Sequence, residues 1–194
     1  MAFLENLILR VVIFLLSLLP FASRVTIGSI LISFIIKVTP KLRTRILQNY
    51  DLVSEKLDIS DRNKFLKLCA ANLGKTFTEF LFNEEFQKQI NLFHYESKEL
   101  EVLKIAKRDN IPVIIVSGHF GPWEAIRAIL KANELETGAL YRRSRNKFYE
   151  PYHLKTIQSG GLPVLQAGKK GTKKMLRHIK TGGFIAFSNC SDVL

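Results

Sequence analysis

The stretch PVIIVSGHFGPWE, residues 112–124, decides the fold of this 194-residue chain. Its first seven residues are mostly β-branched and apolar, which is typical of a buried strand in a parallel sheet. The residues after the turn favour a helix with Pro122 at its first position. Between strand and helix, a turn bracketed by Gly118 and Gly121 carries His119. The stretch therefore predicts a strand, a glycine-rich turn and a helix in succession.

The alternation of strands and helices continues on both sides of this stretch. Strands are predicted at residues 90–95, 112–118, 137–142, 162–166 and 183–187. Helices are predicted between them at residues 97–109, 122–132, 147–158 and 170–180. Two longer helices are predicted upstream, over residues 41–57 and 61–82, from apolar residues that recur near the 3.6-residue period. The pattern predicts a three-layer α/β domain with a mostly parallel central sheet over residues 39–194.

Residues 1–38 form an apolar region that precedes this domain. The runs 11–23 and 25–36 carry no charge, and each is shorter than the roughly 20 apolar residues that a spanning helix needs. Pro20 would break or kink a helix that used both runs. Two membrane-associating helices embedded in one leaflet, with Arg24 reaching the headgroups, fit this pattern best. A single kinked spanning helix, a cleaved signal peptide and a buried hairpin of a soluble protein are the alternatives.

The formal net charge is +12, and most of it lies in one part of the chain. Residues 141–180 hold eleven Lys and Arg and one acid, Glu150. Such a surface attracts phosphates, acidic lipids, nucleic acid or an acidic protein, or it is simply a solvated face. Few aromatic residues lie among the cations and no RNA-recognition signature is present, so we expect no nucleic-acid partner.

No metal or cofactor is predicted. Cys69 and Cys190 are far apart and form neither a disulfide framework nor a zinc pattern. The sequence also lacks the glycine-rich loop and lysine that cradle nucleotide phosphates.

His119 and Glu124 are the predicted catalytic pair. In open α/β sheets, ligands bind beyond the carboxyl ends of the strands, where His119 would lie. An imidazole with a pKa near 6.5 can accept a proton from a hydroxyl, and a carboxylate on its other nitrogen fixes the tautomer. Ser117 does not lie in the G-x-S-x-G pattern of a nucleophile, so the pair predicts direct attack by a substrate hydroxyl on an activated acyl group. The alternative is a turn histidine with a local hydrogen bond, and an acid favoured by the helix dipole.

The run GHFGPWE resembles the H-x4-[D/E] motif of the glycerophosphate-acyltransferase superfamily, in the version found in bacterial lipid A late acyltransferases. The run YRRSRN at residues 141–146 is similar to that family's Y-R-x3-N element. The resemblance implies that His119 is the general base and Glu124 its partner. It also implies substrate-binding roles, which we assign to Arg142, Asn146, Gly121 and Trp123.

The resemblance further implies transfer of a fatty acyl chain from acyl carrier protein to a hydroxyl of a phosphorylated glycolipid, the lipid A precursor, at the cytoplasmic face of the cell inner membrane. The alternatives are a glycerolipid acceptor and a truncated, inactive membrane-binding protein. The family usually carries an Asp-Gln pair after the strand predicted at 183–187, and Asp192 has no glutamine after it. We therefore expect the C-terminal part of the family fold to be missing.

Overall fold

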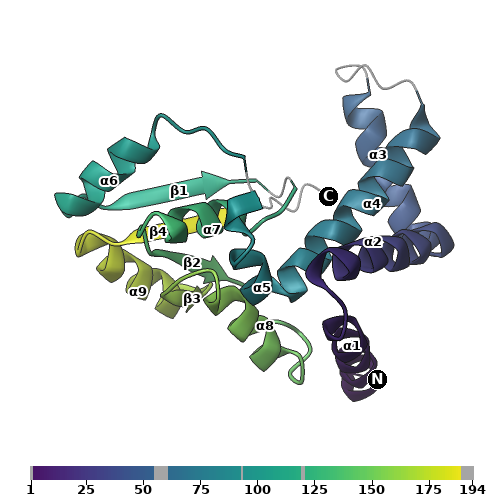
Figure 1. Cartoon of the computed structure of the whole chain (residues 1–194). Coiled ribbons are helices and arrows are strands. Elements are labelled where there is room, and N and C mark those ends of the chain that lie inside the picture. The colour runs from purple at the N-terminus through teal and green to yellow at the C-terminus, as the bar shows by residue number, and fades with distance from the viewer. Residues whose placement is uncertain (1, 55–60, 93, 119–120, 189–194) are drawn as a thin grey trace. The chain divides into compact units, whose positions relative to one another are not determined.

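The computed structural model describes residues 2–54, 61–92, 94–118 and 121–188 (Figure 1). The chain divides into two compact units by its internal contacts. One unit consists of Met1–Ile13 and Phe80–Leu194, and the other of Phe14–Glu79. The first contains a β-sheet with its helices, and the second is helical. The domain boundary predicted between residues 38 and 39 stays a prediction.

The sheet has four strands that are all parallel, in the order β1-β4-β2-β3. The strands are β1 (Val113–Ser117), β2 (Thr137–Tyr141), β3 (Val164–Gln166) and β4 (Phe184–Ser188). The central strand β4 pairs with β1 on one side and with β2 on the other. The predicted α/β class with a parallel sheet is confirmed.

The helices of this unit are α6 (Leu100–Arg108), α7 (Ala125–Ala132), α8 (Glu150–Gln158) and α9 (Lys169–Lys180). Ala106 of α6, Leu130 of α7 and Phe184 of β4 lie in one buried cluster, so α6 and α7 cover the same face of the sheet. The β1–β2 and β3–β4 crossovers run in opposite directions across the sheet. Because crossovers are right-handed, α9 lies on the opposite face from α7.

Strand β1 is less buried than its apolar sequence predicts. Val113 and Ile115 pack against the buried cluster, but Ile114 is 50% exposed and Val116 is 64% exposed. Successive side chains point to opposite faces of a strand, and β1 lies at the edge of the sheet. Only one of its faces is therefore covered within the described part of the chain.

The prediction of a strand at residues 90–95 is wrong. Ile90–Leu92 forms a short 3-10 helix shortly after α5 (Asn83–Gln87), and residues 94–96 belong to no strand. The backbone N–H of Leu92 donates to the carbonyl oxygen of Gln89 at 2.8 Å. Local bonds of this kind satisfy the backbone without a neighbouring strand, so the apolar composition of the segment was misleading.

The apolar N-terminal region forms two helices, α1 (Ala2–Ser17) and α2 (Phe21–Val38), as expected from Pro20. Arg24 bonds to the backbone at the end of α1, and its predicted contact with headgroups stays a prediction. Its Nε donates to the carbonyl oxygen of Leu19 at 2.7 Å, and its Nη2 donates to that of Ser17 at 3.0 Å. The guanidinium thus satisfies carbonyl groups that the end of α1 leaves unpaired.

The second unit contains α2, α3 (Pro40–Val53) and most of α4 (Arg62–Leu81). Helices α2 and α4 approach closely at small residues. A Cβ at Gly74 would lie only 2.7 Å from the Cα of Ser29, and the Ser29 hydroxyl donates to the carbonyl oxygen of Ala71 at 2.9 Å. Small residues permit such close helix packing, which is common among membrane helices.

Among the described residues, α2 alone is long and apolar enough to cross a membrane. This judgement rests on its length and composition, and the helix lies near the N-terminus. Its 18 residues exceed the uncharged run of residues 25–36 because the helix includes Arg24 and Lys37. The predicted pair of in-plane, membrane-associating helices stays a prediction.

Candidate functional site

The two motif blocks found in the sequence begin at the same end of the sheet, where the strands have their carboxyl ends. Residues 118–124 follow the carboxyl end of β1, and residues 142–146 follow the carboxyl end of β2 (Figure 1). Since all four strands are parallel, these ends lie together, with β4 between them. The blocks are thus separated by two strand spacings, roughly 10 Å.

The turn after β1 carries the predicted catalytic residues. His119 lies outside the described residues. Gly121 has φ +60°, and apart from its chain neighbours no described residue has an atom within 4 Å of a Cβ built on it. Glycine is therefore favoured here by the backbone conformation. The helix starts later than predicted, because Pro122 to Ala125 form a turn. Glu124 occupies the N-cap position of α7. Because Pro122 accepts a hydrogen bond from the Ala125 N–H, the helical bonding pattern begins only after the turn.

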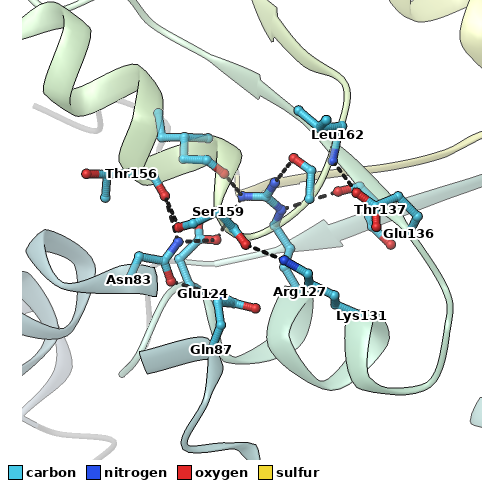
Figure 2. A network of polar contacts seen from close by, with 12 residues as sticks. Asn83, Gln87, Glu124, Arg127, Lys131, Glu136, Thr137, Thr156, Ser159 and Leu162 are labelled. Carbon is cyan, nitrogen blue, oxygen red and sulfur yellow. Dashed lines mark hydrogen bonds and ion pairs between the residues drawn. The ribbon is translucent and has the colours of Figure 1, made fainter. Parts of the chain in front are cut away.

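The Glu124 carboxylate is buried and held by two side chains. Its Oε2 accepts from Arg127 Nη1 at 2.8 Å and from Asn83 Nδ2 at 3.2 Å (Figure 2). The side chains of Arg127 and Glu124 are 5% and 12% exposed. No hydrogen bond joins this carboxylate to the N-terminal amides of α7, so Glu124 does not act as a side-chain cap. We call Asn83, Glu124, Arg127 and Gly160 the Glu124 network.

Burial governs the protonation of this acid. Removal from water raises the pKa of Glu124 above its ordinary value. The charge of Arg127 and the hydrogen bonds from Asn83 and Arg127 lower it, but they do not fully offset the burial. The network therefore holds a carboxylate that is more basic than an exposed glutamate, beside a fixed cation.

Arg127 connects the turn after β1 to the segment after α8. Its Nη1 donates to the carbonyl oxygen of Ile157 at 3.0 Å, and its Nη2 donates to that of Gly161 at 2.8 Å. Its Nε lies 3.5 Å from the carbonyl oxygen of Thr137. One planar guanidinium thus joins Glu124 to three backbone carbonyls on two separate segments, residues 157–161 and Thr137, which suits the fixed fork of arginine donors.

Gly160 makes room for the ion pair. A Cβ at this position would overlap Glu124 Oε2 and would lie 2.8 Å from Arg127 Nη1. Lys131 fixes the same segment by donating from Nζ to the carbonyl oxygen of Ser159 at 2.7 Å (Figure 2). The glycine is therefore needed for the close approach of this segment to the ion pair.

Asn83 is the most buried member of the network, at 1% exposure. Besides Glu124, its Nδ2 donates to the carbonyl oxygen of Thr156 at 2.8 Å, and its Oδ1 accepts from Gln87 Nε2 at 3.0 Å. Its amide group is therefore bonded on both sides, which fixes the direction of the hydrogen bond to Glu124.

Trp123 lies next to Glu124 in the turn. Its ring centroid is 6.0 Å from that of Phe80, with the planes tilted by 58°. The indole is half-buried. Aromatic packing of this kind fixes the ring beside the turn. The substrate-binding roles predicted for Trp123 and Gly121 stay predictions.

The block after β2 is organised by Asn146. Its Oδ1 accepts from the backbone N–H of Phe148 at 3.0 Å, and its Nδ2 donates to the carbonyl oxygen of Ala2 at 2.8 Å. Both sides of the amide are thus used to shape the loop before α8. Arg142 directly follows β2 and is exposed. The substrate-binding roles of these two residues also stay predictions.

A second buried acid, Glu150, supports this loop from the start of α8. Its Oε1 accepts from the Tyr141 hydroxyl at 3.0 Å, and its Oε2 accepts from the backbone N–H of Ser144 at 2.7 Å. The ring of His153 is stacked on Tyr149 at 5.6 Å, and burial lowers the pKa of His153 despite the opposing charge of Glu150. Burial also raises the pKa of Tyr149 to about 12.

The first residues of α1 contact this same loop and α8. The rings of Phe3 and Phe148 meet edge to face at 5.4 Å, and the Arg10 guanidinium lies 5.2 Å from the ring centre of Tyr152. Residues 2–13 of α1 therefore pack beside the block after β2 within one compact unit.

Sequence reasoning missed four residues of this region: Asn83, Arg127, Gly160 and Glu150. Arg127 carried a signal, because an arginine three residues after Glu124 on a helix can pair with it. Asn83 and Gly160 carried none, since their contacts join segments far apart in the chain. Within the described residues, no three His, Cys, Asp or Glu side chains are grouped so that they could hold a metal ion.

Comparison with known protein families supplies a match. Residues 3–190 are similar to the family described as bacterial lipid A biosynthesis acyltransferase. No curated protein sequence matches the chain. The family match extends over nearly all of the chain and includes both motif blocks.

Proposed function

Because the chain belongs to the bacterial lipid A biosynthesis acyltransferase family, we propose that it transfers a fatty acyl chain from acyl carrier protein to a hydroxyl of a phosphorylated lipid A precursor. The proposed location is the cytoplasmic face of the inner membrane. The apolar helix α2 and the exposed apolar side chains of α1 are in keeping with membrane association.

The observation that carries the proposal is the buried carboxylate of Glu124 beside the turn that contains His119 in sequence. Arg127 and Asn83 both bond its Oε2. Oε1 accepts no hydrogen bond from the residues that the structure describes. We propose that Oε1 accepts a hydrogen bond from an N–H of the His119 ring, which would fix the tautomer of the imidazole.

The proposed reaction needs no covalent enzyme intermediate. The other nitrogen of His119 accepts the proton of the acceptor hydroxyl as its oxygen attacks the thioester carbonyl. The tetrahedral intermediate collapses when the carbon–sulfur bond breaks, and the leaving thiolate of the carrier takes the proton from the imidazolium and becomes a thiol. An ester and a free thiol are the products. The negative charge of Glu124 stabilises the imidazolium between the two steps.

The block after β2 supplies the proposed substrate contacts. Arg142 is exposed directly beyond the end of β2, where a cation can bind a phosphate or the carbonyl of the acyl donor. Asn146 and Glu150 shape the loop that presents Arg142, and Asn146 is a further proposed contact to the donor. Gly121 and Trp123 form the proposed opposite wall, after β1.

The test is acyl transfer by the purified full chain in detergent micelles. The donor is an acyl chain on acyl carrier protein, and the acceptor is a phosphorylated lipid A precursor that carries Kdo sugars. We expect transfer by the wild type and a loss of about 100- to 10,000-fold in kcat for His119→Ala. The matched control is Glu84→Ala, which removes an exposed acid of α5 that pairs only loosely with Lys88 at 3.6 Å.

A glycerolipid acceptor, tested in parallel, distinguishes the alternative substrate. Transfer to the glycerolipid and not to the lipid A precursor would replace the proposed acceptor while keeping the chemistry. Transfer to neither, by a chain that is folded and carrier-bound, would contradict the enzymatic function and leave a membrane-binding role.

A further inference from the structure

Helix α9 has a strongly cationic surface. Its twelve residues contain six cations and no acid. The cations are Lys169, Lys170, Lys173, Lys174, Arg177 and Lys180, all of them exposed. None of the six is paired with an acid that the structure describes. A surface with six unneutralised cations carries a strong local field that a partner of opposite charge can use.

The cations occupy one side of the helix. At 100° per residue, they fall within an arc of about 140°. The opposite side is packed against the sheet: Gly171 is buried and lies against the carbonyl of Gln166, and the His178 ring is 3.3 Å from the carbonyl oxygen of Phe184. We call the arc of six cations the α9 basic face.

The α9 basic face begins at the carboxyl-terminal end of the sheet, as the two motif blocks do. Helix α9 follows the carboxyl end of β3, and a pocket of about 550 Å³ lies there. Tyr141, at the end of β2, lines this pocket together with three cations of the face, which are Lys169, Lys170 and Lys174. Strand β3 is three spacings from β1, which corresponds to roughly 15 Å.

We propose that the α9 basic face docks an acidic protein, and that this protein is the carrier that delivers the acyl thioester. The identity of the partner rests on the proposed function. The lysines of the adjacent pocket would bind the phosphate of the carrier's prosthetic arm, whose thioester end then extends along the sheet edge toward the turn after β1.

The packing of α9 favours a protein partner over a lipid bilayer. A helix that binds a membrane surface inserts apolar side chains between the lipids. In α9 the apolar side faces the sheet, and Leu176 at the margin of the basic face is the exposed exception, at 52%. An arc of cations beside one exposed apolar side chain suits the binding of a protein of opposite charge. In such binding, electrostatic attraction sets the association rate and its salt dependence.

The test is steady-state kinetics with two donors. The variant Lys173→Glu/Arg177→Glu reverses two charges on neighbouring turns and spares the three lysines of the pocket. With acyl carrier protein as donor at low salt, we expect the KM for the donor to rise about tenfold or more while kcat is retained. High salt should reduce the difference. With an acyl-pantetheine thioester, which has no protein part, the variant should match the wild type.

Lys64→Glu/Lys67→Glu is the matched control, because it reverses two exposed charges on α4 and should leave the KM unchanged. An unaltered KM for the carrier in the α9 variant would overturn the docking proposal. So would an equal loss with both donors, or weaker binding to anionic vesicles of phosphatidylglycerol with an unchanged carrier KM.

Failure of docking can be separated from failure of the proposed function. Binding of acyl carrier protein to the full chain is measured directly by fluorescence anisotropy, without turnover. Wild-type binding that the α9 variant weakens supports docking even if neither donor supports transfer, an outcome that would overturn the proposed function alone. Absence of wild-type binding overturns docking whatever the activity.

Discussion

Two buried glutamates follow two strands of the same sheet, and they are held in different ways. Glu124, after β1, accepts from a guanidinium and a side-chain amide. Glu150, after β2, accepts from a tyrosine hydroxyl and a backbone N–H. Arg143 lies 3.9 Å from Glu150 with 63% of its side chain exposed, whereas Arg127 beside Glu124 is 5% exposed.

The difference indicates different roles. A buried ion pair stabilises charge at a fixed point, which is what a partner of a catalytic imidazole needs. An acid that gathers a hydroxyl and a backbone N–H instead fixes the path of a loop. We therefore expect changes around Glu124 to alter the chemical step, and changes around Glu150 to alter the binding of substrate.

The largest expected effect is from Arg127→Met. This change leaves the Glu124 carboxylate buried without its cation and removes three contacts to backbone carbonyls. We expect a loss of about 3–5 kcal/mol in the free energy of unfolding, measured by urea unfolding at neutral pH. Arg127→Lys keeps the charge and should lose less. Equal stability of Arg127→Met and the wild type would show that the pair is not a structural necessity.

Gly160→Ala should have the next largest effect. The added Cβ overlaps Glu124 Oε2, so the ion pair has to move. We expect about 1–3 kcal/mol of destabilisation together with a fall in kcat. Gly121→Ala is the comparison, since its Cβ lies within 4 Å of no described residue beyond its chain neighbours, and its φ of +60° should cost about 1–2 kcal/mol. If the two variants lost stability equally with unchanged kcat, crowding of Glu124 would not be the cause.

Glu150→Ala should act on the loop after β2. It removes the acceptor of the Ser144 N–H and of the Tyr141 hydroxyl, which should cost about 1–3 kcal/mol. The KM for the acyl donor should rise more than kcat falls, because Arg142 is carried by this loop. Steady-state kinetics checks the division, and a fall in kcat alone would assign Glu150 to the chemical step instead.

The smallest expected effect is a pH shift in Asn83→Ala. Asn83 donates a hydrogen bond that lowers the pKa of Glu124, so its removal should raise that pKa further. Since the reaction needs the ionised carboxylate, loss of kcat/KM on the acid side should begin at a higher pH than in the wild type. Gln87→Ala, which loses a bond to Asn83 but none to Glu124, should keep the wild-type profile. An unshifted profile in Asn83→Ala would argue that Glu124 does not control the acid limb.

The sequence predicted those parts of the fold that local patterns determine. The run of residues 113–117 formed a strand because it is β-branched and apolar, and parallel pairing followed from the alternation with helices. Exposure of Ile114 and Val116 could not be predicted, since it depends on the position of β1 at the sheet edge. The failed strand at residues 90–95 shows the same limit, because a strand needs a partner that its own residues do not specify.

As with the fold, only the locally determined parts of the candidate site could be predicted from the sequence. The motifs around Glu124 and Arg142 were visible in the sequence, and their meeting at one edge followed from a parallel sheet. Asn83 and Gly160 were not visible as neighbours of Glu124, because they reach it from distant segments. Arg127 had a local signal in its spacing of three residues from Glu124, but the sequence did not show its contacts to distant carbonyls. Long-range polar contacts are set by tertiary packing rather than by local spacing.

A double-mutant cycle on His119 and Glu124 tests the central claim most directly. We measure kcat for acyl transfer by the wild type, His119→Ala, Glu124→Ala and the double variant. Residues that act as one unit are strongly non-additive, so the double variant should be no slower than His119→Ala alone. A double variant whose loss equals the product of the two single losses would contradict the account, because Glu124 would then act independently of the imidazole.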